Sequence, residues 1–324
     1  MQTQSSKFDA AAMLRRFPFL PALGILLLLI VLNGIAEPNS LTIRAMKGVV
    51  STYLALVFLS VAQTFVVYGS DIDLSVGAIL SLVNVSMIVI MNQLGGGPFA
   101  VLLACFLGIF IGALCGLFNG LMVAGLRLQP IVATFATSIL ISGIALWVLP
   151  VAGLPAPSAF WKIYGGRSFG IPNVFFFLTL LVGLLVVIAK TKLVTKLLAV
   201  GNGQLSAYQS GLPVTRIRIS GYVICGIFSA FAAMCITGDT ASGDPLVGGA
   251  MTLSSVAAVV LGGTALSGGA GSAFGSAIGA LIIGLISSLV FYAGTPSEWQ
   301  NLVQGATILA VLMLGVLASR RINK

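Results

Sequence analysis

Histidine is absent from the 324-residue chain. This absence excludes imidazole metal sites, Ser/His/Asp triads and histidine-based proton transfer. Cysteine is scarce as well, and its four copies form no C-x-x-C pair; they are Cys105, Cys115, Cys225 and Cys235. Since all four fall inside apolar runs, we interpret them as small hydrophobic residues of the interior. The sequence therefore predicts neither a metal site nor a cofactor.

Charge is the second shortage. Only 7% of the residues are charged, whereas 58% are hydrophobic and the mean hydropathy is +1.13. A soluble domain carries about 25% charged residues, so this composition excludes a soluble protein. It predicts an all-α, polytopic transmembrane bundle. At about 20 to 25 residues per span, the chain has room for about eight to ten spans, in one domain that covers residues 1–324.

Ten apolar runs predict ten passes, with both ends of the chain on the same side. Two of the runs are also compatible with re-entrant segments. The run at 48–69 follows two basic residues that the ten passes place on the outer side, and the run at 251–266 is short for a span. The first run is interpreted as an uncleaved helix and not as a signal peptide. The ten runs are residues 17–36, 48–69, 74–93, 99–126, 131–150, 174–189, 219–238, 251–266, 272–293 and 302–318.

The basic residues test this threading. The net charge is +9, but these residues lie singly or in pairs at the ends of apolar runs, which indicates orientation and not nucleic-acid binding. The threading places twelve of them on one side and four on the other, and the richer side is expected to be cytoplasmic. We therefore predict cytoplasmic tails at 1–16 and 319–324 and a cytoplasmic loop at 190–218. The twelve are Lys7, Arg15, Arg16, Arg127, Lys190, Lys192, Lys196, Arg216, Arg218, Arg320, Arg321 and Lys324, and the four are Arg44, Lys47, Lys162 and Arg167.

The loop at 190–218 is the one long polar interruption of the chain, and it contains no acidic residue. A turn at 201–203 precedes a stretch without helix breakers, and Gly211 and Pro213 follow it. This pattern predicts a short helix over residues 204–210 that a soluble partner can contact and move. The alternative is an ordinary solvated loop whose basic residues only fix topology. The candidate coupling residues are Gly201, Asn202, Gln204, Ala207, Ser210 and Gly211.

Two rows of glycine at a spacing of four predict close helix packing, because such rows let two backbones approach each other in lipid. The rows are Gly108, Gly112, Gly116 and Gly120, and Gly271, Gly275 and Gly279. Occasional glycines are common in membrane helices, but that does not account for a row of four.

Two aspartates stand between the second and third apolar runs, in the segment GSDIDLSVG at 69–77. A charge at the centre of a bilayer costs about 2.5 to 3.5 kcal/mol, so we expect a helix break near the interface here. Asp71 and Asp73 are two residues apart and would lie on different faces of a helix, which makes them a poor acid–base pair. We interpret one of them as the N-terminal cap of the next helix, in a motif that also includes Ser75 and Gly77.

Several segments, taken in order, resemble one family of membrane transporters. They are DIDLSVG (71–77), Asn119-Gly120, QPIVATFATSILISGIAL (129–146), AVGNGQLSAYQSGL (199–212) and SSVAAVVLGGTALSGGAGSAFGSAIGALIIG (254–284). This set is similar to the ribose/xylose/arabinose-type permeases of ABC importers, over residues 40 to 318. The resemblance implies an inner-membrane subunit for a pentose, hexose or related solute. It also implies three partners, namely a second permease chain, a periplasmic solute-binding protein and a cytoplasmic ATPase that docks on the central loop.

The chain departs from the family pattern in three places. Ser70 and Asp71 stand where the family usually has Gly-Gly, and Ser206, Ala207 and Tyr208 stand where it usually has Ala-Ala-Arg. In the turn before Ser206, the residues GNGQ (201–204) stand where the family usually has Gly-Gly-Asn-Glu, so an acid is missing. The central loop thus lacks an acid and a base that can pair with an ATPase, which is compatible with a diverged subfamily that has its own ATPase.

Polar residues in otherwise apolar helices are the candidates for the translocation pathway: Asn84, Asn119, Thr134, Thr137, Ser138 and Ser142. Ser and Thr can equally bond back to their own helix. Two other classes of protein fit the sequence less well. A secondary transporter would show more intramembrane charge, and a membrane enzyme would show a nucleophile with a base. There is no Gly-Lys dipeptide, hence no Walker A loop, so ATP hydrolysis is expected on another chain.

Overall fold

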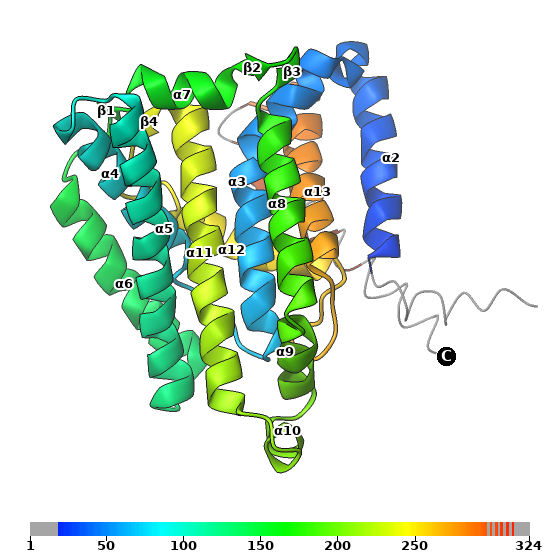
Figure 1. Ribbon diagram of the computed structural model, residues 1–324. Helices are drawn as coiled ribbons and strands as arrows, with labels where there is room; N and C mark the ends of the chain where they lie inside the picture. Colours follow the sequence, from blue (N-terminus) through cyan, green and yellow to red (C-terminus); the bar gives the residue numbers. More distant parts are fainter. Residues whose placement is uncertain are drawn as a thin grey trace, which may run out of the picture.

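The computed structural model describes residues 19–296 together with 299, 302–303, 305–306, 309–310 and 313. The predicted tails at 1–16 and 319–324 lie outside these residues, as does most of the predicted pass at 302–318. The described chain is a helical bundle with two minimal β pairings (Figure 1). Its helices are α2 (Leu20–Ala36), η1 (Pro38–Leu41), α3 (Ile43–Tyr68), α4 (Val76–Gln93), α5 (Pro98–Gly120), η2 (Leu121–Gly125), α6 (Pro130–Val148), α7 (Ser158–Gly165), α8 (Val174–Lys190), α9 (Leu193–Asn202), α10 (Gln204–Gln209), α11 (Val214–Thr240), α12 (Gly249–Leu261) and α13 (Ala273–Tyr292).

Local sequence explains where several of these helices begin. Proline stands in the first turn of α2, α5 and α6, where its missing N–H leaves no helical hydrogen bond unmade. Ser272 caps α13 by accepting a hydrogen bond from the Gly275 N–H at 3.3 Å. The strands have two residues each: β1 (Leu154–Pro155) pairs antiparallel with β4 (Ser242–Gly243), and β2 (Arg167–Ser168) pairs with β3 (Ile171–Pro172).

Six described helices are long and apolar enough to cross a membrane: α3, α4, α5 continued by η2, α6, α11 and α13. The number rises to seven if α8 and α9, which are bent by 70°, form one span. The prediction of eight to ten spans is therefore not confirmed. Helix α3 has 26 residues and is long and apolar enough to cross, which favours a span over a re-entrant segment at 48–69. Helix α12 has 13 residues and is too short to cross alone.

The bundle has an inner and an outer part. In α3 and α4, 72% of the most apolar window is buried, against 28% in α5 and α6. Helix α11 also lies in the interior, whereas α2 stands at the edge (Figure 1). Helix α10 projects from one end of the bundle, and α7, β2 and β3 cover the other end (Figure 1). Cys225 and Cys235 are buried, Cys105 and Cys115 are partly buried, and all four are free thiols.

The glycine rows make the expected close contacts. On α5, a Cβ at Gly112 would meet the carbonyl oxygen of Gly226, and a Cβ at Gly116 would meet that of Tyr222, both on α11. On α13, Gly279 lies in the same way against the carbonyl of Ala258 in α12. The prediction of tight helix packing is confirmed at these positions. Gly271 is an exception, because it precedes α13 and belongs to a loop.

Candidate functional site

Three segments that are far apart in the sequence meet at the α10 end of the bundle. They are the connector between α3 and α4 (69–75), the end of α9, and the loop between α12 and α13 (262–272). The Ser70 hydroxyl oxygen lies 2.8 Å from the carbonyl of Gly201 and 2.7 Å from that of Ser267. We call this meeting point the three-segment junction.

The junction leaves no room for larger side chains. The Gly269 N–H donates to the carbonyl of Tyr68 at 3.2 Å, and the Asn202 amide donates to the Gly269 carbonyl at 3.2 Å. A Cβ at Gly201 would collide with the Tyr68 carbonyl and the Gly269 nitrogen. Gly201 is therefore required for packing in the last turn of α9, and not for the turn that the sequence suggested.

Ser70 adopts a conformation that favours glycine. Its φ is +68°, in the left-handed region, where a non-glycine residue costs on the order of 1 kcal/mol. The permease family that the sequence resembles usually has glycine near this position. In this chain, the two carbonyl partners of the Ser70 hydroxyl offset the strain, although its single proton can serve only one of them at a time.

Asp71 forms an ion pair with Arg218 of α11. The guanidinium donates through Nε to Oδ2 at 3.0 Å and through a terminal nitrogen to Oδ1 at 2.8 Å. The side chains are only 4% and 11% exposed, respectively. Of the two aspartates interpreted as a possible helix cap, Asp71 is therefore not one: its carboxylate binds a cation 147 residues away. Sequence reasoning had assigned Arg218 a topological role only.

Asp73 is fully buried and bound by neutral donors. Its Oδ1 accepts from the N–H and the hydroxyl of Ser75, both at 2.7 Å. The Asn119 amide donates to the Ser75 hydroxyl at 2.6 Å and lies 3.5 Å from Asp73 Oδ2. Within the described part of the chain no cation pairs with Asp73, and burial raises the pKa of its carboxyl. The N-cap position of α4 is Ser75, and it makes no side-chain cap bond, so Asp73 fixes the chain just before the helix without capping it.

The connector is also tied to neighbouring helices. The Thr134 hydroxyl of α6 accepts from the Leu74 N–H at 3.0 Å, and the Thr252 hydroxyl of α12 accepts from the Gly77 N–H at 3.2 Å. A Cβ at Gly77 would collide with the Gly248 carbonyl. The motif residues at 71, 73, 75 and 77 thus fix one rigid crossing between α3 and α4.

The pathway candidates separate into two groups. Asn119 and Thr134 lie at the connector. Asn84 is farther along α4, where its amide donates to Thr237 at 2.7 Å and accepts from the Asp244 N–H at 2.9 Å. Thr137 bonds back to the Thr134 carbonyl, and Ser138 bonds back to its own helix on an exposed face. The structure therefore brings only two of the six candidates, Asn119 and Thr134, to the connector.

The short helix α10 is confirmed, and so is its stop. Gly211 has φ +79°, and its N–H donates to the Tyr208 carbonyl at 2.9 Å. Ala207, one of the candidate coupling residues, is however only 5% exposed and faces the bundle, so it does not offer a docking surface to a partner. The exposed apolar residues of α10 are Leu205 and Tyr208, each 71% exposed. We call these two side chains the α10 knob.

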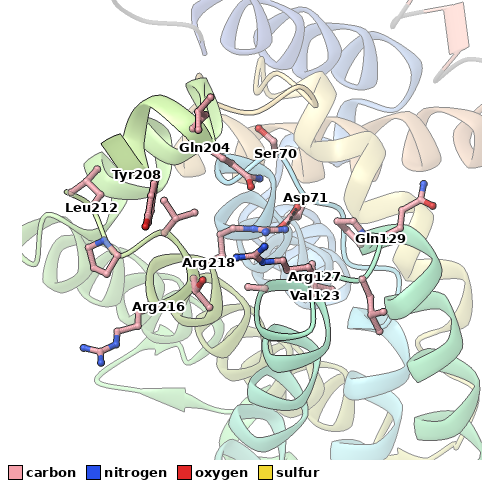
Figure 2. Close-up of a pocket in the computed structure, with 17 residues that line it drawn as sticks. Ser70, Asp71, Val123, Arg127, Gln129, Gln204, Tyr208, Leu212, Arg216 and Arg218 are labelled. Atoms are coloured by element: carbon pink, nitrogen blue, oxygen red, sulfur yellow. Dashed lines mark hydrogen bonds and ion pairs between the residues drawn. The ribbon is translucent and has the colours of Figure 1, made fainter. Parts of the chain in front are cut away.

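A cleft of about 870 Å³ opens beside α10. Figure 2 shows Asp71 and Arg218 facing each other in it, with Arg127 nearby and Tyr208 on the α10 side. Arg216 extends away from this pair (Figure 2). The cleft thus joins the α10 knob to the connector of α3 and α4.

A helical bundle with several spans, an exposed loop helix at one end and rigid crossings within it is characteristic of a polytopic membrane transport protein. Residues 45–312 match the family described as the permease component of the branched-chain amino acid transport system, and the chain belongs to this family. It is accordingly the transmembrane permease subunit of an ABC importer, as the sequence predicted.

The similar curated proteins are import permeases. The chain is 33% identical to the ribose import permease protein of Bacillus subtilis, over 97% of both chains. It is 29% identical to the ribose import permease protein of Escherichia coli K12, over 89% of this chain and 91% of that one. It is 28% identical to the autoinducer 2 import system permease protein LsrD of Salmonella paratyphi A, over 92% of both. No solved structure matches the chain.

Proposed function

We propose that this permease carries a sugar or sugar-like solute from a periplasmic binding protein into the cytoplasm, with a second permease chain beside it and a separate ATPase as the energy source. The family description names branched-chain amino acids, but the similar proteins reported above import ribose or autoinducer 2. The ribose import permease that is 33% identical over 97% of both chains is better evidence for the solute class than a description shared by the whole family.

We assign the end that carries α10 to the cytoplasm. Arg127, Arg216 and Arg218 line the cleft at this end. At the opposite end, Lys47 donates to the Gly165 carbonyl of α7 at 2.9 Å, so its charge lies on the other side. Under the positive-inside rule this separation favours a cytoplasmic loop at 190–218.

The α10 knob is the proposed contact with the ATPase. The two large side chains of the knob lie on a six-residue helix and are largely exposed, so their packing against the bundle stabilises them little. Exposed apolar side chains on a projecting element are typical of a surface that binds another protein. Gly211 holds the helix at a fixed angle, and buried Ala207 fixes its inner face. A push on the knob would therefore move α10 as a unit.

Two connections lead from α10 to the membrane interior. One runs from the end of α9 through the hydrogen bond between Gly201 and Ser70 into the connector. The other runs along the start of α11 to Arg218 and across the ion pair to Asp71. Both end in the 69–75 segment that carries α4, and Asn119 and Thr134 bond to that segment. We propose that this segment transmits the motion of the ATPase to the solute pathway.

The test places a charge on the knob. Tyr208→Glu leaves every span unchanged, so the protein should insert normally, but it should lose co-purification of the ATPase and uptake of labelled ribose in cells that carry the whole importer. Leu94→Glu, at an exposed position before α5, is the matched control and should retain the ATPase. Normal ATPase association in Tyr208→Glu would refute the proposed docking site. Uptake of a branched-chain amino acid but not of ribose would refute the proposed solute class.

A further inference from the structure

A second cavity lies far from the cleft, between α2, α3 and α13. Its volume is about 130 Å³. An engineered aliphatic cavity of about 150 Å³ holds a benzene molecule, so this space suits a short aliphatic fragment. We call it the α2 crevice. It is lined by Leu26, Ile30, Asn33, Ser40, Leu41, Met46, Val49, Val50, Leu281, Leu285, Ser288 and Tyr292.

The α2 crevice is apolar at one end and polar at the other. Helices α2 and α13 run in the same direction, because Phe19 and Phe274 stack edge to face near their starts. Along α2 the lining residues change from Leu26 and Ile30 to Asn33, and along α13 they change from leucines to Ser288. Two independent helices thus place their polar groups toward the same membrane surface, which is the polarity of a lipid that has its chain in the bilayer and its headgroup at the interface.

Two buried polar atoms at the polar end have no partner among the described residues. The Asn33 amide donates to the carbonyls of Leu29 at 2.9 Å and Leu285 at 3.1 Å, but its oxygen accepts from none of the described residues. The Ser40 hydroxyl is likewise unpaired among them. Buried polar atoms are normally hydrogen-bonded, so these two atoms suit a ligand that brings its own hydrogen-bonding group.

The position of the crevice decides where such a donor comes from. Helix α2 stands at the edge of the bundle (Figure 1), and Leu27, Leu28 and Val31 on its other face are exposed. A molecule that reaches the crevice therefore comes from the bilayer. We propose that the α2 crevice binds one phospholipid, with an acyl chain between Ile30 and Leu285. A headgroup O–H or N–H then donates to Asn33 and Ser40. This site is separate from the proposed transport function.

Photolabelling tests this assignment. The purified protein is reconstituted in vesicles of phosphatidylethanolamine and phosphatidylglycerol that contain a trace of phosphatidylethanolamine with a diazirine on its acyl chain. After illumination, peptide mapping should find adducts on α2 and α13 at the crevice well above those at Leu102 and Phe106, which are exposed on α5.

Variants separate a bound lipid from the surrounding bilayer. Ile30→Trp fills the crevice and should abolish its adducts, whereas Val31→Trp, on the exposed face of the same helix, should not. Ser40→Ala removes a hydroxyl that has no partner among the described residues, so folding should be unchanged while labelling falls about two- to tenfold, as expected for one lost hydrogen bond. Equal labelling of the crevice and of α5, or crevice adducts that persist in Ile30→Trp, would overturn the proposal.

Discussion

Arg218→Met removes the cation of the Asp71–Arg218 pair and keeps an unbranched apolar chain in place of the arginine stem. The Asp71 carboxylate would then be buried without a partner, since it is only 4% exposed. Breaking a buried ion pair in this way costs about 3 to 5 kcal/mol. We expect about 3 kcal/mol of lost unfolding free energy, because Arg218 lines the cleft and the space it leaves can admit water.

The unfolding free energy lost in Arg218→Met should depend on pH. Burial raises the pKa of the Asp71 carboxyl, and Arg218 opposes this rise. Without Arg218 the folded state binds a proton more tightly than the unfolded state does. Stability gained from that proton is present at acid pH and is lost as the pH rises from the unfolded pKa through the higher folded pKa. The Arg218→Met variant should therefore approach the wild type at acid pH and fall behind it as the pH rises through the raised folded-state pKa of Asp71.

A double-mutant cycle measures the pair itself. Unfolding free energies would be measured in detergent for the wild type, Arg218→Met, Asp71→Asn and the double variant. Because neutral groups replace both charges, the double variant should lie within about 1 kcal/mol of the wild type. With a loss of about 3 kcal/mol in Arg218→Met, and whatever further loss Asp71→Asn causes alone, the interaction energy is at least about 2 kcal/mol. Arg216→Met is the control, because Arg216 lies two residues before Arg218 and its side chain is exposed. This variant should change stability by less than about 0.5 kcal/mol. Additive losses in the double variant would refute the structural role of the pair.

Three other predictions follow from the packing and the backbone. Gly116→Leu should overpack the contact of α5 with Tyr222 and cost about 1 to 3 kcal/mol, whereas Gly24→Leu, with open space around it, should be mild; equal tolerance in a thermal-shift assay would contradict the packing. Ser70→Ala keeps the left-handed strain and loses the hydroxyl, so it should be less stable than Ser70→Gly by about 1 kcal/mol, and the reverse order would contradict the account of Ser70. Gly211→Val should insert normally but lose coupled uptake, because φ +79° disfavours a branched side chain; normal uptake would show that the angle of α10 is unimportant.

The features that sequence predicted well depend on local signals. A spacing of four between glycines is visible without a structure, and it predicted a close helix contact at Gly112 and Gly116, although only the structure shows that α11 is the partner. In the same way, Gly211 ends α10 because few residues other than glycine adopt its conformation. The family resemblance supplied the transport function, which neither composition nor spacing can give.

The features that sequence missed depend on contacts between distant segments or on very short elements. Asp71 and Arg218 are 147 residues apart, so no spacing links them. The six residues of α10 are too few for a periodic pattern, which is why Ala207 was placed on the wrong face. Counting apolar residues cannot tell the short helix α12 from a span, and this raised the predicted number of passes.

We propose that the α10 knob is the surface on which the ATPase docks. The most direct measurement replaces Tyr208 by a photoreactive phenylalanine analogue in membranes that contain the whole importer, and identifies the crosslinked partner by mass spectrometry. Leu94 carries the same group as the control, at the opposite end of the bundle. The account predicts a crosslink to the ATPase from position 208 and none from position 94. A crosslink from position 208 to the periplasmic binding protein, or the absence of any ATPase adduct there, would contradict it.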